Sequence, residues 1–218
     1  MKLSLPSERL AAYVAKQIET FFPDNAMAGL TFTSYIAPAL ERLEYCFSRI
    51  NNKYFFNGSE TVFNHLHSDQ YAIFLYYLSN TIWRRSADEL LASKVYCLNK
   101  ALHALDAFYE VILPEVFLLV HPVGTVLGRG TYGNYFVAYQ RCTVGANLSG
   151  EYPTIKEGTV LYGDSVIIGR SHLGKNSWVS AGSLLMDIEV PSDQVVFGRH
   201  PKVHWKPAER SVVDHYFR

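Results

Sequence analysis

The fold of this chain is decided by residues 155–185, IKEGTVLYGDSVIIGRSHLGKNSWVSAGSLL. Every sixth residue is a large aliphatic one, and the residue four positions later is a small hydroxyl residue. An α-helix repeats about every 3.6 residues and a strand about every two, so neither explains a period of six. The aliphatic positions are Ile155, Leu161, Ile167, Leu173, Val179 and Leu185, and the hydroxyl positions are Thr159, Ser165, Ser171, Ser177 and Ser183.

A period of six is typical of a triangular coil in which each hexad forms one flat side. The aliphatic residue then points into a narrow interior, and the small residue lets the chain turn a corner. Traced backwards, the small position falls on Thr125, Thr131, Val137 and Thr143.

A loop is predicted to interrupt the coil. Thr143 and Thr159 are sixteen residues apart, which is two hexads plus four extra residues that must leave the coil. Residues 146–153, ANLSGEYP, have the turn-rich composition of a projecting loop. Loops on a rigid scaffold commonly carry function.

The first half of the chain is predicted to be helical. A capping signal, Pro6-Ser7-Glu8, precedes apolar residues at helical spacing, and the same spacing recurs from Thr33 to Phe47. Two further helices are expected to begin near Ser68 and Ser86. We therefore expect a helical domain over residues 1–118, a coil over 119–207 with its loop at 146–153, and a tail over 208–218.

Composition excludes some classes of protein. The 218 residues are 49% hydrophobic and 18% charged, a normal globular balance. Lys and Arg number 20 and equal Asp and Glu at 20, so the formal net charge is zero. Nucleic-acid-binding proteins usually carry a basic surplus, and no nucleic-acid partner is expected.

No targeting or membrane segment is predicted. The chain has no apolar run near the roughly 18 residues that a membrane span needs, and its first residues lack the apolar core of a signal peptide. Cys46, Cys97 and Cys142 are an odd number at unpatterned spacings. They are interpreted as reduced thiols of a cytoplasmic protein rather than as metal ligands.

A motif in the second half resembles a known family. His121-Pro122-Val123-Gly124-Thr125-Val126-Leu127-Gly128 is similar to the active-site motif H-x-x-G-x-V-x-G of serine acetyltransferases. The resemblance continues through Tyr139–Gly145, the projecting loop and the repeats, and ends with the tail motif at Gly198–Pro207. It implies an α+β fold, an N-terminal α-helical domain followed by a C-terminal left-handed parallel β-helix of hexapeptide repeats.

The resemblance also implies an acyltransferase that moves acetyl from acetyl-CoA to a hydroxyl of a small acceptor. A base must take the alcohol proton, and histidine suits this because its pKa lies near neutrality. His121 is the candidate base. The related enzymes orient this histidine with an aspartate fifteen residues earlier, which is Asp106 here, and Glu110 is the alternative. The family further implies a homotrimer, or a hexamer built as a dimer of trimers, with active sites between neighbouring coils.

Motif matching assigns further contacts. Gly163, Ser180, Ala181 and Gly182 are expected to bind coenzyme A, with Lys202 and Lys206 near its phosphates. No metal is expected. The acceptor is expected to meet residues of the Tyr139–Gly145 motif and of the loop, namely Gln140, Gly145, Glu151 and Tyr152.

The loop departs from the family pattern. Serine acetyltransferases usually carry Arg-His before a proline to engage the acceptor carboxylate, whereas Glu151 and Tyr152 precede Pro153 here. Val120 replaces an aspartate that precedes the family's histidine. Both changes remove groups that recognise a free amino acid, so a sugar hydroxyl competes with L-serine as the acceptor.

Two other functions remain open. The chain is alternatively an N-acetyltransferase of an amino sugar in surface-glycan synthesis, or a non-catalytic β-helix scaffold. The remaining histidines favour neither. His65 and His67 have no visible third metal ligand, and His172 occupies a repeat position typical of a structural residue.

Overall fold

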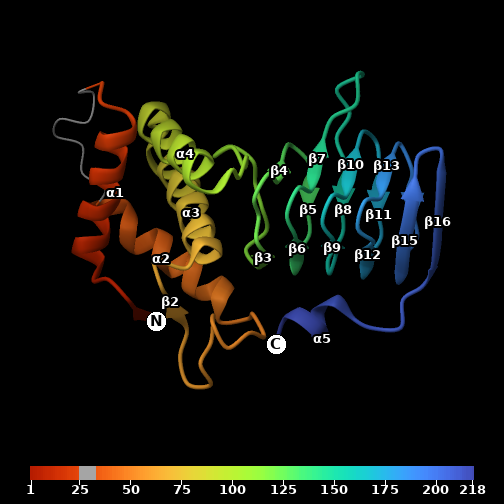
Figure 1. The fold of residues 1–218 in the computed structure, drawn as a ribbon, viewed down its shortest axis with the longest axis horizontal. Coiled ribbons are helices and arrows are strands. Elements are labelled where there is room, and N and C mark those ends of the chain that lie inside the picture. The colour runs from red at the N-terminus through yellow and green to blue at the C-terminus, as the bar shows by residue number, and fades with distance from the viewer. Residues whose placement is uncertain (25–32) are drawn as a thin grey trace.

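A computed structural model of the protein describes residues 1–24 and 33–218. Helices occupy the N-terminal half, and a stack of parallel strands occupies the C-terminal half (Figure 1). The short strands β1 and β2 pair in parallel beside the helices. The bounds are β1 Lys2–Leu3, α1 Ser7–Phe21, α2 Thr33–Phe47, β2 Val62–Phe63, α3 Ser68–Ser86 and α4 Glu89–His103.

The helices pack around α3, whose residues from Asp69 to Ile82 are all buried. The fourth helix starts later than expected. Ser86 is the last residue of α3, Ala87 follows with a left-handed φ of 52°, and Asp88 caps α4 by accepting a hydrogen bond from the Leu91 amide at 2.9 Å. An aspartate is a strong N-cap, which explains why α4 begins after it.

The strands form the three faces of a coil. Val160 lies opposite Trp178 in register, so one full turn takes 18 residues, or three hexads. The first face contains β3 (Phe117–Leu119), β6 (Phe136–Ala138), β9 (Val160–Leu161), β12 (Ser177–Val179) and β15 (Gln194–Arg199). The second face contains β4 (Val126–Leu127), β7 (Thr143–Gly145), β10 (Val166–Ile168) and β13 (Leu184–Met186). The third face contains β5 (Thr131–Tyr132), β8 (Thr154–Ile155), β11 (His172–Leu173) and β14 (Glu189–Val190).

The two classes of hexad residue behave as predicted. The aliphatic residues from Ile155 to Leu185 are at most 1% exposed and fill the interior. The small hydroxyl residues are buried at the corners, where several donate to the carbonyl three residues earlier. Ser171 donates to Ile168 at 2.8 Å and Ser177 to Gly174 at 2.7 Å. These bonds satisfy polar groups that a tight corner would otherwise bury unpaired.

The backward trace of the small position is wrong by one residue in part. Thr143 pairs with Val166, so the residue level with Ser165 is Cys142, which is fully buried. The turn that contains the loop runs from Val137 to Val160, which is 23 residues and therefore five more than 18. The loop adds five residues rather than four, because cysteine also fits the corner.

The close stacking of turns gives a first testable prediction. A Cβ at Gly174 would overlap the backbone nitrogen of Ser192 and lie 2.7 Å from the Pro191 carbonyl carbon, whereas a Cβ at Gly145 would meet nothing within 4 Å. Gly174→Ala should lower the free energy of unfolding by about 1–3 kcal/mol. Gly145→Ala is the matched control, and equal denaturation midpoints for the two variants would contradict the packing described.

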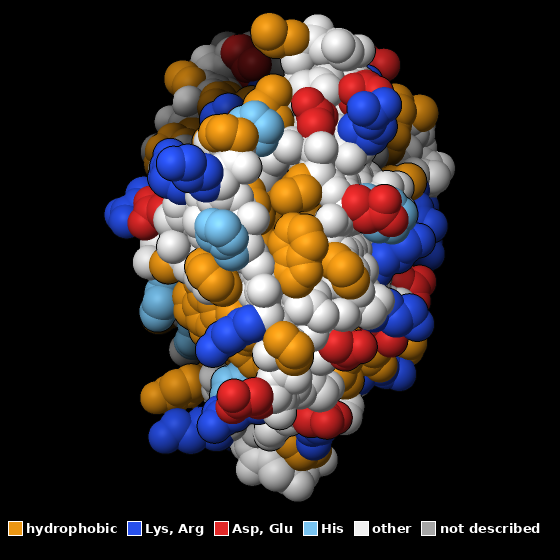
Figure 2. Space-filling model, turned by 90° about the vertical axis from the view of Figure 1, so that its right-hand side faces the viewer, with side chains coloured by type: hydrophobic (Ala, Val, Ile, Leu, Met, Phe, Trp, Pro, Cys, Tyr) orange, Lys and Arg blue, Asp and Glu red, His pale blue; other side chains and the backbone are white. Residues whose placement is uncertain are grey.

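The coil ends in a hairpin. β16 (Lys202–Pro207) pairs antiparallel with β15, from Gln194 opposite Pro207 to Arg199 opposite Lys202. Phe197 and Trp205 in this hairpin are 40% and 41% exposed. Figure 2 views this end of the molecule and shows hydrophobic side chains gathered at its centre, with charged side chains around them.

The tail returns along the first face toward the helices (Figure 1). It contains α5 (Val212–Tyr216). The Trp178 indole N–H donates to the Arg210 carbonyl at 3.1 Å, and the hydroxyls of Tyr139 and Tyr162 each lie 3.0 Å from that of Tyr216. We call residues 208–218 the strap.

The strap ends on the helical half. The Arg218 amide donates to the Arg49 carbonyl and its guanidinium Nε to the Ser48 carbonyl, both at 2.8 Å. Val137 and Val160 point out of the coil on the face that the strap crosses, yet both are 0% exposed. The strap therefore covers an apolar face and joins the two halves of the chain.

Candidate active site

His121 lies at the corner between β3 and β4, where the coil meets the helices. Its φ of 48° is left-handed, and its side chain is 79% exposed. The His121 amide donates to Oδ2 of Asp69 at 3.1 Å, and the ring Nδ1 lies 3.7 Å from the same oxygen. The Asp69 side chain, in the first turn of α3, is only 9% exposed. An exposed imidazole therefore stands in front of a buried carboxylate.

Asp106 is not brought to His121. Its carboxylate accepts hydrogen bonds from the Tyr96 hydroxyl at 2.7 Å and from Lys100 at 2.6 Å. Burial would raise the pKa of Asp106, but these bonds outweigh it and hold the pKa below its usual value. The reason is local, because Asp106 follows the end of α4 directly and folds back on its last turns. Asp69 takes the place expected for it.

The alternative carboxylate is also engaged elsewhere. Glu110 lies with Oε2 3.5 Å from Nη2 of Arg129. Asp69 is 52 residues before His121 in the chain. The sequence marks Asp69 only as part of a helix-capping signal.

Several predicted contacts lie along one edge of the coil. The Arg141 amide donates to the Val123 carbonyl at 3.0 Å, the Asp164 amide to Gln140 at 3.1 Å, and the Gly182 amide to Gly163 at 3.0 Å. These bonds link successive turns, so the corner that begins at His121 continues through the predicted coenzyme A contacts. We call this row the His121 edge; it contains His121, Gln140, Gly163, Ser180, Ala181 and Gly182.

Glycine is required at one point of this edge. A Cβ at Gly163 would lie 2.8 Å from Nε2 of Gln140. The Gln140 side chain therefore packs against the bare backbone of the next turn.

The remaining predicted acceptor contacts lie on another edge. Gly145 ends β7, and the projecting loop with Glu151 and Tyr152 begins just after it. Tyr152 is 43% exposed. Within one chain, the structure does not bring this loop edge together with the His121 edge.

The loop is organised by Asn147. Its Oδ1 accepts from the amides of Ser149 at 3.0 Å and Glu151 at 3.1 Å. Its Nδ2 donates to Glu151 Oε2 at 2.8 Å and to Asp187 Oδ1 at 3.0 Å. Oε1 of Glu151 also lies 3.7 Å from Nη1 of Arg170. The Glu151 carboxylate is therefore turned toward the coil and partly neutralised.

This arrangement predicts the effect of removing one side chain. Asn147→Ala deletes the acceptor of the Ser149 and Glu151 amides, and hydrogen bonds to charged groups are worth about 1.5–3 kcal/mol. Hydrogen exchange in the loop should accelerate about tenfold or more. Ser149→Ala, which alters an exposed side chain of the same loop, is the control. Unchanged exchange in Asn147→Ala would contradict the proposed organisation.

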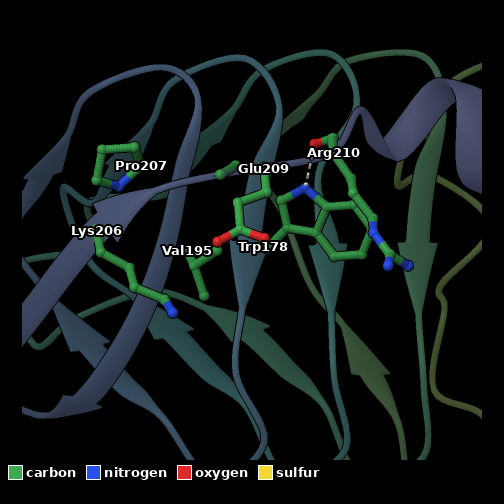
Figure 3. Close-up of a pocket in the computed structure, with 7 residues that line it drawn as sticks. Trp178, Val195, Lys206, Pro207, Glu209 and Arg210 are labelled. Carbon is green, nitrogen blue, oxygen red and sulfur yellow. Dashed lines mark hydrogen bonds between the residues drawn. The ribbon is translucent and has the colours of Figure 1, made fainter.

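The two tail lysines are separated. Lys202 pairs with Arg199, whose guanidinium donates to the Gly182 carbonyl at 3.0 Å, so Lys202 is near the His121 edge. Lys206 instead lines a cavity of about 290 Å³ between the first face and the strap. Figure 3 shows its ammonium group and the Glu209 carboxylate on the same side of that cavity, near Val195.

Two searches of the described residues concern metals and membranes. In residues 1–24 and 33–218, no three His, Cys, Asp or Glu side chains gather in a way that could hold a metal ion. Over the same ranges, no helix has the length and apolar character to cross a membrane.

No family model matches the chain. A curated relative, a serine acetyltransferase of Synechococcus elongatus, is 28% identical over 123 residues, which are 54% of this chain and 50% of the relative. The chain therefore spans about half the length of the curated relative that it matches.

Solved structures match more of the chain. The serine acetyltransferase of Vibrio cholerae has a TM-score of 0.70 and 18% identity, covering 96% of this chain and 83% of that one. The enzyme of Brucella abortus has a TM-score of 0.69 and 16% identity, covering 93% and 84%. The matches include a serine acetyltransferase in complex with CoA, and one of Neisseria gonorrhoeae in complex with serine. The resemblance to serine acetyltransferases is confirmed, as is the fold of N-terminal helices followed by a left-handed parallel β-helix.

Proposed function

We propose that this protein is an acetyl-CoA-dependent O-acetyltransferase of the serine acetyltransferase type, with His121 as the general base. The observation that carries the proposal is the exposed His121 imidazole at the head of the coil edge, with the buried Asp69 carboxylate behind it at 3.7 Å. A carboxylate on the Nδ1 side favours the tautomer with a free Nε2 and stabilises the imidazolium. Asp69, rather than Asp106, is the positioning residue.

The reaction follows from this geometry. The acceptor hydroxyl attacks the thioester carbonyl carbon while Nε2 of His121 takes its proton. The new C–O bond forms, the C–S bond of acetyl-CoA breaks, and the thiolate of coenzyme A leaves and is protonated. The products are an acetyl ester and free coenzyme A.

Coenzyme A would lie along the His121 edge. Gly163 and the Ser180–Gly182 run expose backbone where a side chain would block close approach. The CoA complex of a similar structure supports this class of ligand. We assign the phosphate contact to Lys202, because Lys206 lies on the neighbouring face. No metal is needed for this chemistry.

A trimer would complete the site. The loop edge and the His121 edge lie apart in one chain, so a second copy is needed to place Glu151 and Tyr152 before His121. The second face offers a contact surface, because its outward column of Val126, Val166 and Leu184 is not covered by the strap. We propose a homotrimer, or a hexamer in which helical halves join two trimers. Light scattering on the eluting protein measures its mass, and a monomer would contradict this arrangement.

The acceptor is a small molecule with a hydroxyl group. Relatives named serine acetyltransferases, and a structure with bound serine, support L-serine. The Glu151 carboxylate would repel the carboxylate of serine, which supports a sugar hydroxyl instead. The unpaired cysteines support a cytoplasmic location, where thiols stay reduced.

The experiment is thiol release from acetyl-CoA with L-serine and with a panel of free and nucleotide-linked sugars. Turnover with serine alone would assign the protein to amino-acid acetylation, and turnover with a sugar alone to glycan modification. An amide product would identify an N-acetyltransferase. Absence of turnover together with absence of thermal stabilisation by coenzyme A would overturn the proposal in favour of a scaffold.

A further inference from the structure

The helical half contains two adjoining cavities between α2 and α3. The larger, of about 360 Å³, is lined by Arg42, Arg84, Arg85, Thr81, Glu41 and Glu115, among others. The second, of about 340 Å³, shares three of these side chains with the first and is walled by two tyrosines, Tyr45 and Tyr77. A basic compartment and an aromatic compartment therefore meet at Arg42.

Arg42 is held in a fixed position. Its Nη1 donates to the Thr81 hydroxyl at 2.8 Å, and its Cζ lies 4.7 Å from the centroid of the Tyr77 ring. Thr81 and Tyr77 are 3% and 1% exposed, so both supports are rigid. Burial lowers the pKa of the Arg42 guanidinium, the direction expected for a cation taken out of water.

The charges of the cavity do not cancel. Three arginines and two glutamates line it, which gives 3 − 2, or one net positive charge. Among the described residues, none of these five side chains forms an ion pair within 4.0 Å. Arg84 and Arg85 stand in the last turn of α3, where the helix dipole favours cations. Arg42 comes from the other helix, so the dipole does not explain why it converges on them.

We propose that this cavity binds a small organic monocarboxylate. Guanidinium groups match a carboxylate with paired N–H donors, and one negative charge balances the net charge of the cavity. A hydroxyl or ammonium group of the ligand would meet Glu41 or Glu115, and its apolar part would lie against Tyr45 and Tyr77. The site is in the helical half and does not depend on the acetyl transfer proposed above.

The test uses 4-hydroxybenzoate as the probe, because it combines a carboxylate, a hydroxyl and an apolar ring. Calorimetry at constant ionic strength measures its Kd for the full chain, with phenol, inorganic phosphate and sodium chloride as comparison ligands. Arg84→Gln combined with Arg85→Gln should raise the Kd about tenfold or more, since hydrogen bonds to charged groups are lost. Arg129→Gln, an exposed arginine far along the chain that pairs with Glu110, should leave it unchanged.

Arg42→Lys adds a second variant. It keeps the charge but loses the planar fork, and it should also raise the Kd about tenfold while the melting temperature without ligand stays near that of the wild type. Saturable binding that follows this pattern supports the site. No saturable binding to the wild type, equal affinity in all variants, equal affinity for phenol, or tighter binding of phosphate would each overturn it.

Discussion

Replacing His121 by alanine is expected to reduce acetyl transfer by about 10²–10⁴-fold, the usual contribution of a general base. The side chain is 79% exposed, so the variant should keep the unfolding midpoint and the coenzyme A affinity of the wild type. Thiol release with the acceptor found above measures the effect. His172→Ala, which alters an exposed histidine on the third face, is the matched control. Retention of more than about a tenth of the turnover would defeat the assignment.

Asp69→Asn distinguishes positioning from mere structure in the same assay. Asparagine keeps an oxygen for the His121 amide, which Asp69 accepts at 3.1 Å, but removes the negative charge beside the imidazole. Loss of that charge disfavours imidazolium, so the apparent pKa in the pH–rate profile should fall as turnover falls. A lower rate with an unchanged profile would mean that Asp69 only supports the corner.

Replacing Phe217 by alanine is expected to lower the free energy of unfolding by about 3–5 kcal/mol. Phe217 is 2% exposed, and its ring centroid lies 5.2 Å from that of Tyr135 on the coil. Its backbone also pairs with Ile50 of the helical half. The side chain is thus buried where the strap joins both halves.

Phe21→Ala is the control for this variant, since Phe21 is 47% exposed at the end of α1. Urea unfolding followed by tryptophan fluorescence measures both variants, because Trp178 lies under the strap. A loss below about 1 kcal/mol for Phe217→Ala would mean that the strap contributes little to stability.

The regular part of the fold was predictable because its physics is local and repetitive. A hexad places an aliphatic residue inside and a small residue at a corner whatever surrounds it, so Ile155 to Leu185 sufficed. The helices were predictable from spacing for the same reason. The trace through Thr131, Val137 and Thr143 slipped by one residue, because the corner accepts cysteine as well as a hydroxyl residue and the pattern weakens there.

The parts that escaped prediction depend on contacts between distant segments. Asp69 reaches His121 only because α3 docks against the first corner of the coil, and 52 residues separate the two. Asp106 was expected from family spacing, but Lys100 and Tyr96 on the preceding helix capture its carboxylate. The strap had no signal, since its polar and aromatic composition does not reveal which face it covers.

The strap also imposes an order of events during synthesis. Arg218 bonds to Ser48, 170 residues earlier in the chain, so this contact forms only after translation ends. Helices and coil turns can assemble as they leave the ribosome, while the apolar first face waits for its cover. A chain that stalls or is cut before residue 208 would present Val137, Val160 and Trp178 to solvent, and such products should be recognised by chaperones or proteases although nearly every strand is in place.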